Sequence, residues 1–185
     1  MSSIIEYFSI IVNTIIFKIN RLEFSKIQGK GICYVRNKGI LLIGKNFRFN
    51  SGKFFNPIGG DTMLRLIVLK NGKLRIGDNV GVSNCSIFCS SQIIIEDNVL
   101  IGGGVRIWDT DFHSLNYKLR GTKEDFGLSK PINVRKNAFI GAGSIILKGV
   151  EIGENSIVGA GSVVAKSIPE NEIWAGNPCK KIRNL

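Results

Sequence analysis

Histidine, paired cysteines and helix-forming residues are scarce in this sequence, and each shortage excludes a class of protein. The chain has 1 His and 4 Cys, and no two of the cysteines form a C-x-x-C pair, so no zinc-ligand set is present. Only 5 Ala stand against 29 Ile, 12 Val, 22 Gly and 17 Asn, a balance that disfavours a helical bundle or an alternating α/β domain. A chain of 185 residues suits one domain, so any active site is built into that fold or shared between copies.

The sequence also lacks the features of a secreted protein. Residues 1–24 have neither the basic start nor the small-residue cleavage site of a secretory signal. Cys33, Cys85, Cys89 and Cys179 are therefore interpreted as reduced, small core residues. We expect a cytoplasmic protein that needs no metal.

Positive charge is concentrated in the first part of the chain. Residues 1–75 hold 13 Lys or Arg and 3 Asp or Glu, a net charge of +10, whereas residues 76–185 hold 12 and 11, a net charge of +1. Such a basic half suits an anionic membrane surface, a phosphorylated substrate or plain solvation. No aromatic-interleaved basic cluster or nucleic-acid reader motif is present, so we expect no nucleic-acid partner.

Aliphatic residues recur every six positions, and this repeat dominates the sequence. The step is unbroken at Val134, Ile140, Ile146, Ile152, Val158 and Val164. Upstream it runs through Ile76, Val82 and Phe88 and then slips by one residue to Ile95, Ile101 and Ile107. A helix cannot sustain a strict six-residue step, and antiparallel hairpins would alternate every two residues.

A slower marker, an aliphatic residue followed three positions later by Asn, overlies this step. It occurs at Ile43/Asn46, Ile76/Asn79, Ile95/Asn98, Val134/Asn137 and Ile152/Asn155, with spacings of 33, 19, 39 and 18 residues. Eighteen is three sixes, which predicts a coil with three flat sides, a triangular parallel β-helix, over residues 32–185. The spacing of 39 indicates one coil plus an extended loop at about 113–133, and the spacing of 33 indicates either two short coils or one coil plus a further excursion.

Residues 1–31 precede the coil pattern and form a helix with its lead-in. Apolar residues at helical spacing predict a helix over residues 3–20, with a narrow polar face made by Ser2, Glu6, Ser9, Asn13 and Asn20. This segment is too short and too polar for a membrane span. Two interpretations stay open: the helix packs against the end of the β-helix or a partner subunit, or it lies in a membrane interface as a peripheral anchor.

His113 stands where the six-residue register stops, at the head of the predicted loop. Its flank supplies Asp109 and Asp111, two carboxylates of the kind that orient an imidazole or raise its basicity. Functional residues concentrate in surface excursions from rigid scaffolds. From the residues alone, a general base and a structural histidine both stay open.

Several segments together resemble one known family. They are the hexapeptide pattern, the segment from His113-Ser114-Leu115 through Leu119-Arg120 to Pro131-Ile132, the run from Phe139 to Gly143, and the ending from Ile168 to Cys179. They resemble the hexapeptide-repeat acyltransferases, and within them the sugar O-acetyltransferases of the galactoside and maltose acetyltransferase group and of surface-polysaccharide clusters. The resemblance covers residues 76–185 well and residues 32–75 loosely. It implies a left-handed coil, a homotrimer, and acetyl-CoA bound as acyl donor in a groove between subunits.

The same resemblance implies roles for individual residues. His113 would be the general base, and the backbone amide of Ala142 would stabilise the thioester oxyanion during a single-step transfer. Asp111 is a further catalytic candidate, because alternation along an extended strand would place it on the side of His113. The substrate-binding candidates are Ser83, Asn84 and Arg120. The cofactor-binding candidates are Phe139, Gly141, Ala142, Ala160, Ala165, Lys166, Lys180 and Arg183.

The expected function is therefore acetyl-CoA-dependent O-acetylation of a sugar hydroxyl, in bacterial surface-polysaccharide biosynthesis. Two alternatives stay open. One is N-acetylation of a nucleotide-linked amino sugar, and the other is a non-catalytic β-helix that binds through its basic half.

Overall fold

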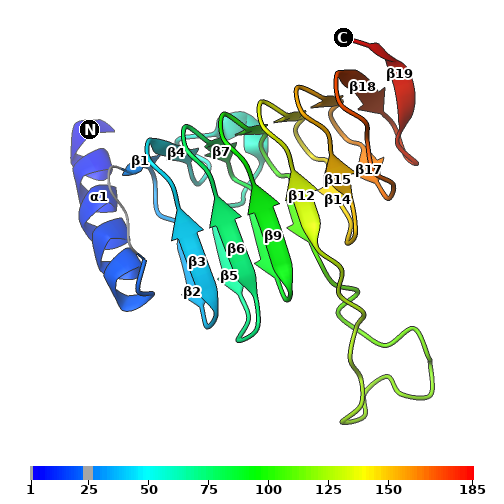
Figure 1. Cartoon of the computed structure of the whole chain (residues 1–185). Coiled ribbons are helices and arrows are strands. Elements are labelled where there is room, and N and C mark those ends of the chain that lie inside the picture. Colours follow the sequence, from blue (N-terminus) through cyan, green and yellow to red (C-terminus); the bar gives the residue numbers. More distant parts are fainter. Residues whose placement is uncertain (1, 23–26) are drawn as a thin grey trace.

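The chain forms a three-sided coil of short parallel strands, which the computed structural model describes over residues 2–22 and 27–185 (Figure 1). Sheet A contains β1 (Ile27–Lys30), β4 (Phe47–Asn50), β7 (Gly81–Ser83), β10 (Leu100–Ile101), β13 (Phe139–Ile140), β16 (Ile157–Val158), β18 (Glu172–Ala175) and β19 (Lys180–Asn184). Sheet B contains β2 (Tyr34–Asn37), β5 (Arg65–Val68), β8 (Ser86–Cys89), β11 (Arg106–Trp108), β14 (Ile145–Ile146) and β17 (Val163–Val164). Sheet C contains β3 (Ile40–Ile43), β6 (Lys73–Ile76), β9 (Gln92–Ile95), β12 (Ile132–Val134) and β15 (Glu151–Ile152).

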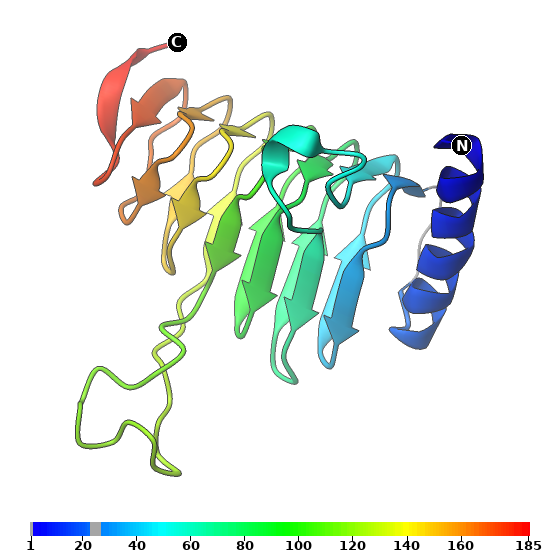
Figure 2. The ribbon, with the colours of Figure 1, turned by 180° about the vertical axis from the view of Figure 1, so that it is seen from behind.

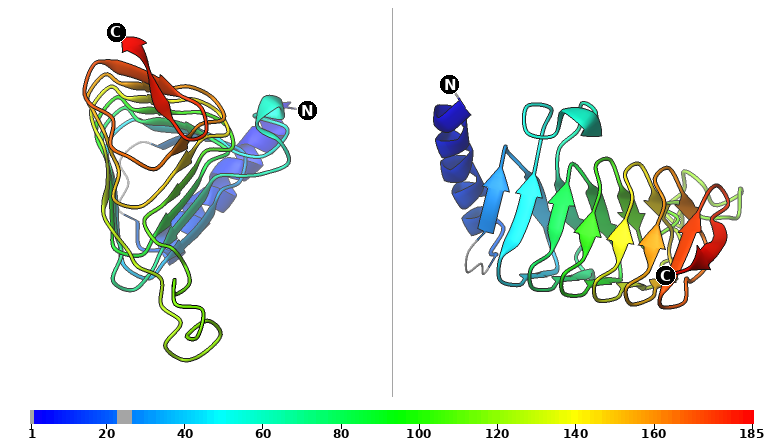
Figure 3. Two further views of the ribbon diagram at one scale, coloured as in Figure 1. Left: turned by 90° about the vertical axis from the view of Figure 1, so that its right-hand side faces the viewer. Right: turned by 90° about the horizontal axis from the view of Figure 1, so that it is seen from above.

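Successive strands pass from sheet A to B to C and return to A, so the cross-section is a triangle (Figure 3). The strands pair in parallel, except that β19 runs antiparallel to β18. The predicted left-handed parallel β-helix is confirmed. We call its edges the A–B, B–C and C–A corners, after the sheets that each edge joins.

The six-residue step marks the core. The six residues of the unbroken run, from Val134 to Val164, are all buried and point into the triangle. The upstream step is wrong at one position, because Ile87 and Cys89 are buried while Phe88 between them faces outward, as alternation along a strand requires. The ring of Phe88 instead packs against Phe112, with the ring centroids 4.8 Å apart.

Three of the four cysteines belong to this core. Cys33, Cys85 and Cys89 are buried, and burial raises the pKa of each thiol to about 12. Thiols held in the neutral form are poor nucleophiles, which agrees with their interpretation as packing residues.

The asparagine marker forms a ladder along the C–A corner. Asn46, Asn79, Asn98, Asn137 and Asn155 all adopt φ between 56° and 60°. This left-handed conformation is one that Asn tolerates better than most residues. Each side-chain amide donates to the carbonyl oxygen of the next Asn at 2.8–3.2 Å, and Asn171 ends the row. Ile168 pairs with Ile152, so Ile168/Asn171 is a sixth member of the marker.

Two excursions interrupt the coil at different corners (Figure 2). The predicted loop spans residues 109–131 between β11 and β12, at the B–C corner. The spacing of 33 residues proves to be one coil plus an excursion of residues 51–64, which contains the short helix η1 (Pro57–Gly59) at the A–B corner. Both excursions leave the three sheets undisturbed.

Helix α1 (Ser2–Ile19) closes the N-terminal end of the coil (Figure 1). Ser9, Asn13 and Phe17 are buried on its inward side. Asn13 donates through Nδ2 to the carbonyl of Gly31 at 2.8 Å and accepts from the N–H of Cys33 at 3.1 Å. Asn20 accepts from the N–H of Asn37 at 2.8 Å. Within residues 2–22 and 27–185, no strand pairs with the first coil on this side, so its free backbone groups need polar partners.

This orientation differs from the usual packing of an amphipathic helix, in which the apolar face covers the core. The predicted packing against the end of the β-helix is present, but it uses a mixed face, in which Asn13 supplies hydrogen bonds and Phe17 joins the hydrophobic core. The first paired strand starts at Ile27, so the coil begins before the expected boundary at residue 32. Over residues 2–22 and 27–185, no helix has the length and apolarity needed to cross a bilayer.

Candidate active site

His113 lies in the 109–131 excursion, where Asp125 holds its imidazole. His113 Nδ1 is 2.8 Å from Asp125 Oδ2. The histidine side chain is 72% exposed and the aspartate side chain only 11%, so the carboxylate lies beneath a ring that faces solvent. The described residues offer no second partner to the ring, which leaves Nε2 free to accept a proton.

Asp125 is an anion that the loop backbone holds in place. Its Oδ1 accepts from the N–H of Ser114 at 2.7 Å, and its Oδ2 accepts from the N–H of Gly121 at 2.9 Å. These two bonds, followed by the bond to His113, lower the pKa of Asp125 from 3.8 to about 2. An ionised carboxylate accepts a hydrogen bond from Nδ1–H, and in that tautomer the neutral imidazole carries its lone pair on Nε2.

The lowered pKa of Asp125 predicts how the loop responds to acid. A depressed pKa stabilises the folded loop fully above the ordinary value of 3.8, and this stabilisation is lost as pH falls through about 2. We therefore expect the amides of Ser114 and Gly121 to be protected from hydrogen exchange at pH 5 and to lose protection between about pH 4 and pH 2. Asp125→Asn should remove much of this protection already at pH 5. Equal protection in the variant and the wild-type chain would contradict the assignment.

Asp111 does not contact the imidazole, which corrects the expectation from strand alternation. Its Oδ1 lies 2.6 Å from Nζ of Lys148, one coil further along the same corner. Asp109 is fully buried and accepts from the N–H groups of Ser90 and Ser91 at 2.7 Å each. Both flanking carboxylates thus fix the base of the excursion, and Asp125, which the sequence analysis missed, orients the ring.

The Arg120 side chain forms hydrogen bonds within the 109–131 excursion. Its Nε donates to the carbonyl of Ser114 at 2.9 Å, and its Nη2 donates to the carbonyl of Leu115 at 3.2 Å. These bonds span the turn that carries His113. The predicted role of Arg120 in substrate binding therefore stays a prediction, whereas its role in shaping the loop is visible.

Ala142 lies at the A–B corner, between β13 and β14, and its side chain is exposed. The neighbouring N–H groups are used within the coil: Gly141 donates to Val158 and Gly143 donates to Gly103, both at 2.8 Å. The N–H of Ala142 itself finds no acceptor among residues 2–22 and 27–185. A free N–H beside small residues is open to a ligand atom.

The corner repeats this arrangement one coil later. Gly159 donates to Trp174 at 2.8 Å and Gly161 donates to Ala142 at 2.8 Å. The exposed Ala160 between them has no acceptor for its N–H in the described part of the chain. Two free amides therefore follow one another along the A–B corner.

A groove of about 720 Å³ crosses the outer face of sheet A, from α1 to Phe139. Its lining includes Lys30, Arg48 and Ser83 on successive strands and the half-exposed ring of Phe139 at the far end. Gly102 also lines the groove, and a Cβ built there would lie 2.6 Å from the nitrogen of Ala142. The groove thus ends beside the first free amide of the corner.

Of the two neighbouring substrate candidates, Ser83 lines this groove and Asn84 does not. Asn84 is buried, and its Oδ1 accepts from the N–H of Gly52 at 2.7 Å. Its Nδ2 donates to the carbonyl of Asn56 at 3.4 Å. Asn84 therefore ties the 51–64 excursion to the corner, and its side chain is buried rather than presented to the groove.

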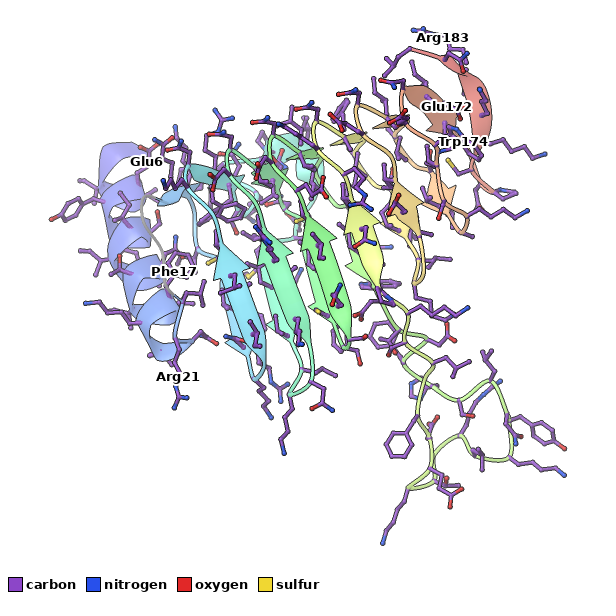
Figure 4. All side chains as sticks on the ribbon, in the orientation of Figure 1. Glu6, Phe17, Arg21, Glu172, Trp174 and Arg183 are labelled. Carbon is purple, nitrogen blue, oxygen red and sulfur yellow. The ribbon has the colours of Figure 1, made fainter. Side chains whose placement is uncertain are left out.

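The cofactor candidates do not gather at one place in a single chain. Phe139, Gly141, Ala142 and Ala160 lie on sheet A or at the A–B corner, as described above. Ala165 and Lys166 follow β17 at the B–C corner, the corner of the His113 excursion. Lys180 and Arg183 lie exposed on β19, and Figure 4 shows Arg183 at the end of the coil opposite Glu6 and α1.

Comparisons with known proteins agree with this architecture. Family models described as "Bacterial transferase hexapeptide (six repeats)" and "Hexapeptide repeat of succinyl-transferase" match residues 131–166 and 92–107. The galactoside O-acetyltransferase of Lactococcus lactis is 37% identical over 72% of this chain and 65% of its own length. That of Escherichia coli is 40% identical over 60% of this chain and 54% of its own length. The chain thus spans between about half and two thirds of these curated relatives.

A solved structure of a galactoside acetyltransferase in complex with coenzyme A shares the fold. It has a TM-score of 0.59 and 27% sequence identity, and the match covers 92% of this chain and 68% of that one.

Proposed function

Because the chain belongs to the hexapeptide-repeat transferase family, we propose that it is an acetyl-CoA-dependent O-acetyltransferase that acts on a sugar hydroxyl. The observation that carries the proposal is the His113–Asp125 pair, in which an anion orients an exposed imidazole with a free Nε2. The named activity of the galactoside relatives belongs to the same class.

The reaction needs two groups from the protein. His113 Nε2 takes the proton of the acceptor hydroxyl while the oxygen attacks the thioester carbonyl of acetyl-CoA. The N–H of Ala142 donates to the carbonyl oxygen as it becomes negative. The thioester C–S bond then breaks, the coenzyme A sulfur takes the proton from the imidazolium, and the products are an acetyl ester and free coenzyme A. No acetyl-enzyme forms.

These two groups stand on opposite edges of sheet B, so we infer that neighbouring copies complete the site. His113 and Lys166 lie at the B–C corner, while Ala142 and Ala160 lie at the A–B corner. A head-to-tail ring of three chains would bring one corner of each copy against the other corner of the next. Coenzyme A would then lie between copies, with Lys166, Lys180 and Arg183 near its phosphates.

The outer face of sheet B supports this packing. It carries the half-buried side chains of Ile67, Phe88, Trp108, Ile145 and Val163. Ile67, Phe88 and Trp108 lie in one row across the sheet, and Ile145 and Val163 continue the neighbouring row after Arg106. An apolar area of this kind suits burial between subunits.

The groove on sheet A is the proposed acceptor site. Glu6, Lys30 and Arg48 line it, and Lys30 is paired with Glu6. Arg48 therefore suits an acceptor with a phosphate or carboxylate, and Ser83 offers a hydroxyl for a sugar. A charged glycan of this kind fits a cytoplasmic step in bacterial surface-polysaccharide biosynthesis.

An acceptor screen tests the proposed function. The purified protein is incubated with acetyl-CoA and a panel of hydroxyl-only sugars, amino sugars and their phosphorylated forms, while release of coenzyme A and the acetylated product are measured. We expect ester products and higher turnover with anionic acceptors. Amide products alone would assign N-acetylation, and the absence of both acetyl-CoA binding and turnover would leave a non-catalytic binding protein.

A further inference from the structure

The outward side of α1 is an uncovered apolar stripe. Ile4, Phe8, Ile11, Ile15 and Ile19 are 75%, 59%, 46%, 53% and 74% exposed. Their spacing repeats every three or four residues, which places all five on one side of the helix. We refer to these five residues as the α1 stripe.

The α1 stripe cannot turn inward without loss of the contacts that dock the helix. Ser9, Asn13 and Phe17 are buried on the opposite side, and Figure 4 shows Phe17 on the side of α1 that faces the coil. The hydrogen bonds of Asn13 and Asn20 to the first coil fix this orientation. The stripe therefore stays available to a partner outside the chain.

The charge of this end of the molecule identifies the partner. Residues 1–75, which include α1 and the first two coils, carry a net charge of +10. Lys18 and Arg21 are exposed at the C-terminal end of the helix, and Glu6, the one acidic residue of α1, pairs with Lys30 at 3.4 Å. A second copy packed on the stripe would place two strongly positive ends together, whereas anionic lipid headgroups would be attracted.

We propose that the α1 stripe is a membrane-docking surface that inserts into the interface of an anionic bilayer. The apolar side chains enter the boundary between headgroups and acyl chains, and the surrounding lysines and arginines contact lipid phosphates. Insertion of apolar side chains alone, or attraction of basic residues to anionic lipid alone, gives only weak membrane binding. The two together give strong binding. This surface does not depend on acetyl transfer.

Docking would also orient the proposed acceptor groove. Ile10 of α1 and Lys30 of β1 line the groove at this end of the coil. A docked protein therefore presents the groove to glycans held at the membrane surface. In the proposed trimer, three parallel coils would place three stripes on one face, which strengthens binding through avidity.

Vesicle co-sedimentation tests this surface. The full chain is mixed with vesicles of phosphatidylcholine, alone or with phosphatidylglycerol, and the bound fraction is measured at low and high salt. We expect binding to the anionic vesicles only, and weaker binding at 1 M salt, where the Debye length falls to about 3 Å from about 10 Å at 0.1 M. Binding that is absent at low salt, or equal on both vesicles, would overturn the proposal.

Two substitutions of exposed isoleucines test whether the α1 stripe is the surface that binds the membrane. Ile15→Glu should lower binding at least about tenfold, because a carboxylate in the stripe opposes both insertion and attraction to anionic lipid. Ile182→Glu, at 62% exposure on β19 at the other end of the coil, should bind like wild type. Lys18→Glu tests the electrostatic part without changing the stripe. Turnover on a soluble acceptor should be unchanged in the Ile15 and Lys18 variants, which separates this proposal from the proposed activity.

Light scattering without lipid tests whether a second copy of the chain, instead of a membrane, covers the α1 stripe. If the stripe joins two copies, the wild-type assembly will double in size as concentration rises, and Ile15→Glu will prevent the doubling. That result would replace the membrane with a second copy. We expect the same particle size for both proteins.

Discussion

His113→Ala is expected to lower turnover at least about 10²-fold while coenzyme A binding is retained, because the variant loses the positioned base but none of the groups near the ligand phosphates. The side chain is 72% exposed, so its removal leaves no cavity in the fold. Steady-state kinetics, together with a coenzyme A titration, measures the two effects separately. A variant with wild-type turnover would remove His113 from the reaction.

Substitution of Asp125 and of Asp111 tests which aspartate orients the His113 ring. Asp125→Asn keeps the shape of the side chain but weakens its hold on Nδ1, so kcat should fall about 10-fold or more with little change in the KM for acetyl-CoA. Asp111→Asn removes a carboxylate that is paired with Lys148 instead, and its kcat should stay within a few-fold of wild type. The reverse order of effects would restore Asp111 as the residue that orients the ring.

Ala142→Trp is the second change expected to have a large effect. The residue is exposed at the A–B corner, so the new ring projects outward and the coil should keep its melting temperature. The ring would cover the free N–H and the end of the groove beside Phe139, and loss of an oxyanion donor costs about 10²- to 10³-fold in kcat. Ala142→Ser keeps both the N–H and the open corner, so its rate should remain near wild type. Equal rates for the two variants would place the oxyanion donor elsewhere.

The coil could be predicted from the sequence because its constraints are local and periodic. Each flat side of a coil sends at least one side chain inward, and the C–A corner needs a residue that tolerates positive φ. The pattern from Val134 to Val164 and the asparagine marker both follow from these two requirements. Ala142 is a candidate through the family resemblance, not through this register. Phe88 was misassigned because the six-residue count cannot tell which of two neighbouring strand residues points inward.

The residues that escaped prediction depend on contacts between distant segments. Asp125 lies twelve residues beyond His113 in an excursion without periodicity, and only the folded loop brings the two together. Asn84 was assigned to the acceptor, but its amide serves the 51–64 excursion. The inverted packing of α1 follows from the free backbone groups of the first coil, which are polar partners that hydropathy alone does not reveal.

The central claim is that each active site combines the His113 corner of one copy with the Ala142 corner of the next, and mixed assembly of two inactive variants tests it most directly. His113→Ala and Ala142→Trp chains are co-expressed with different affinity tags, and the doubly tagged trimers are purified and assayed. The doubly tagged trimers should regain about one third of wild-type activity, because each mixed ring contains one site of three with both corners intact. Activity no higher than that of either variant alone, or a monomer that turns over at the wild-type rate, would contradict the shared site.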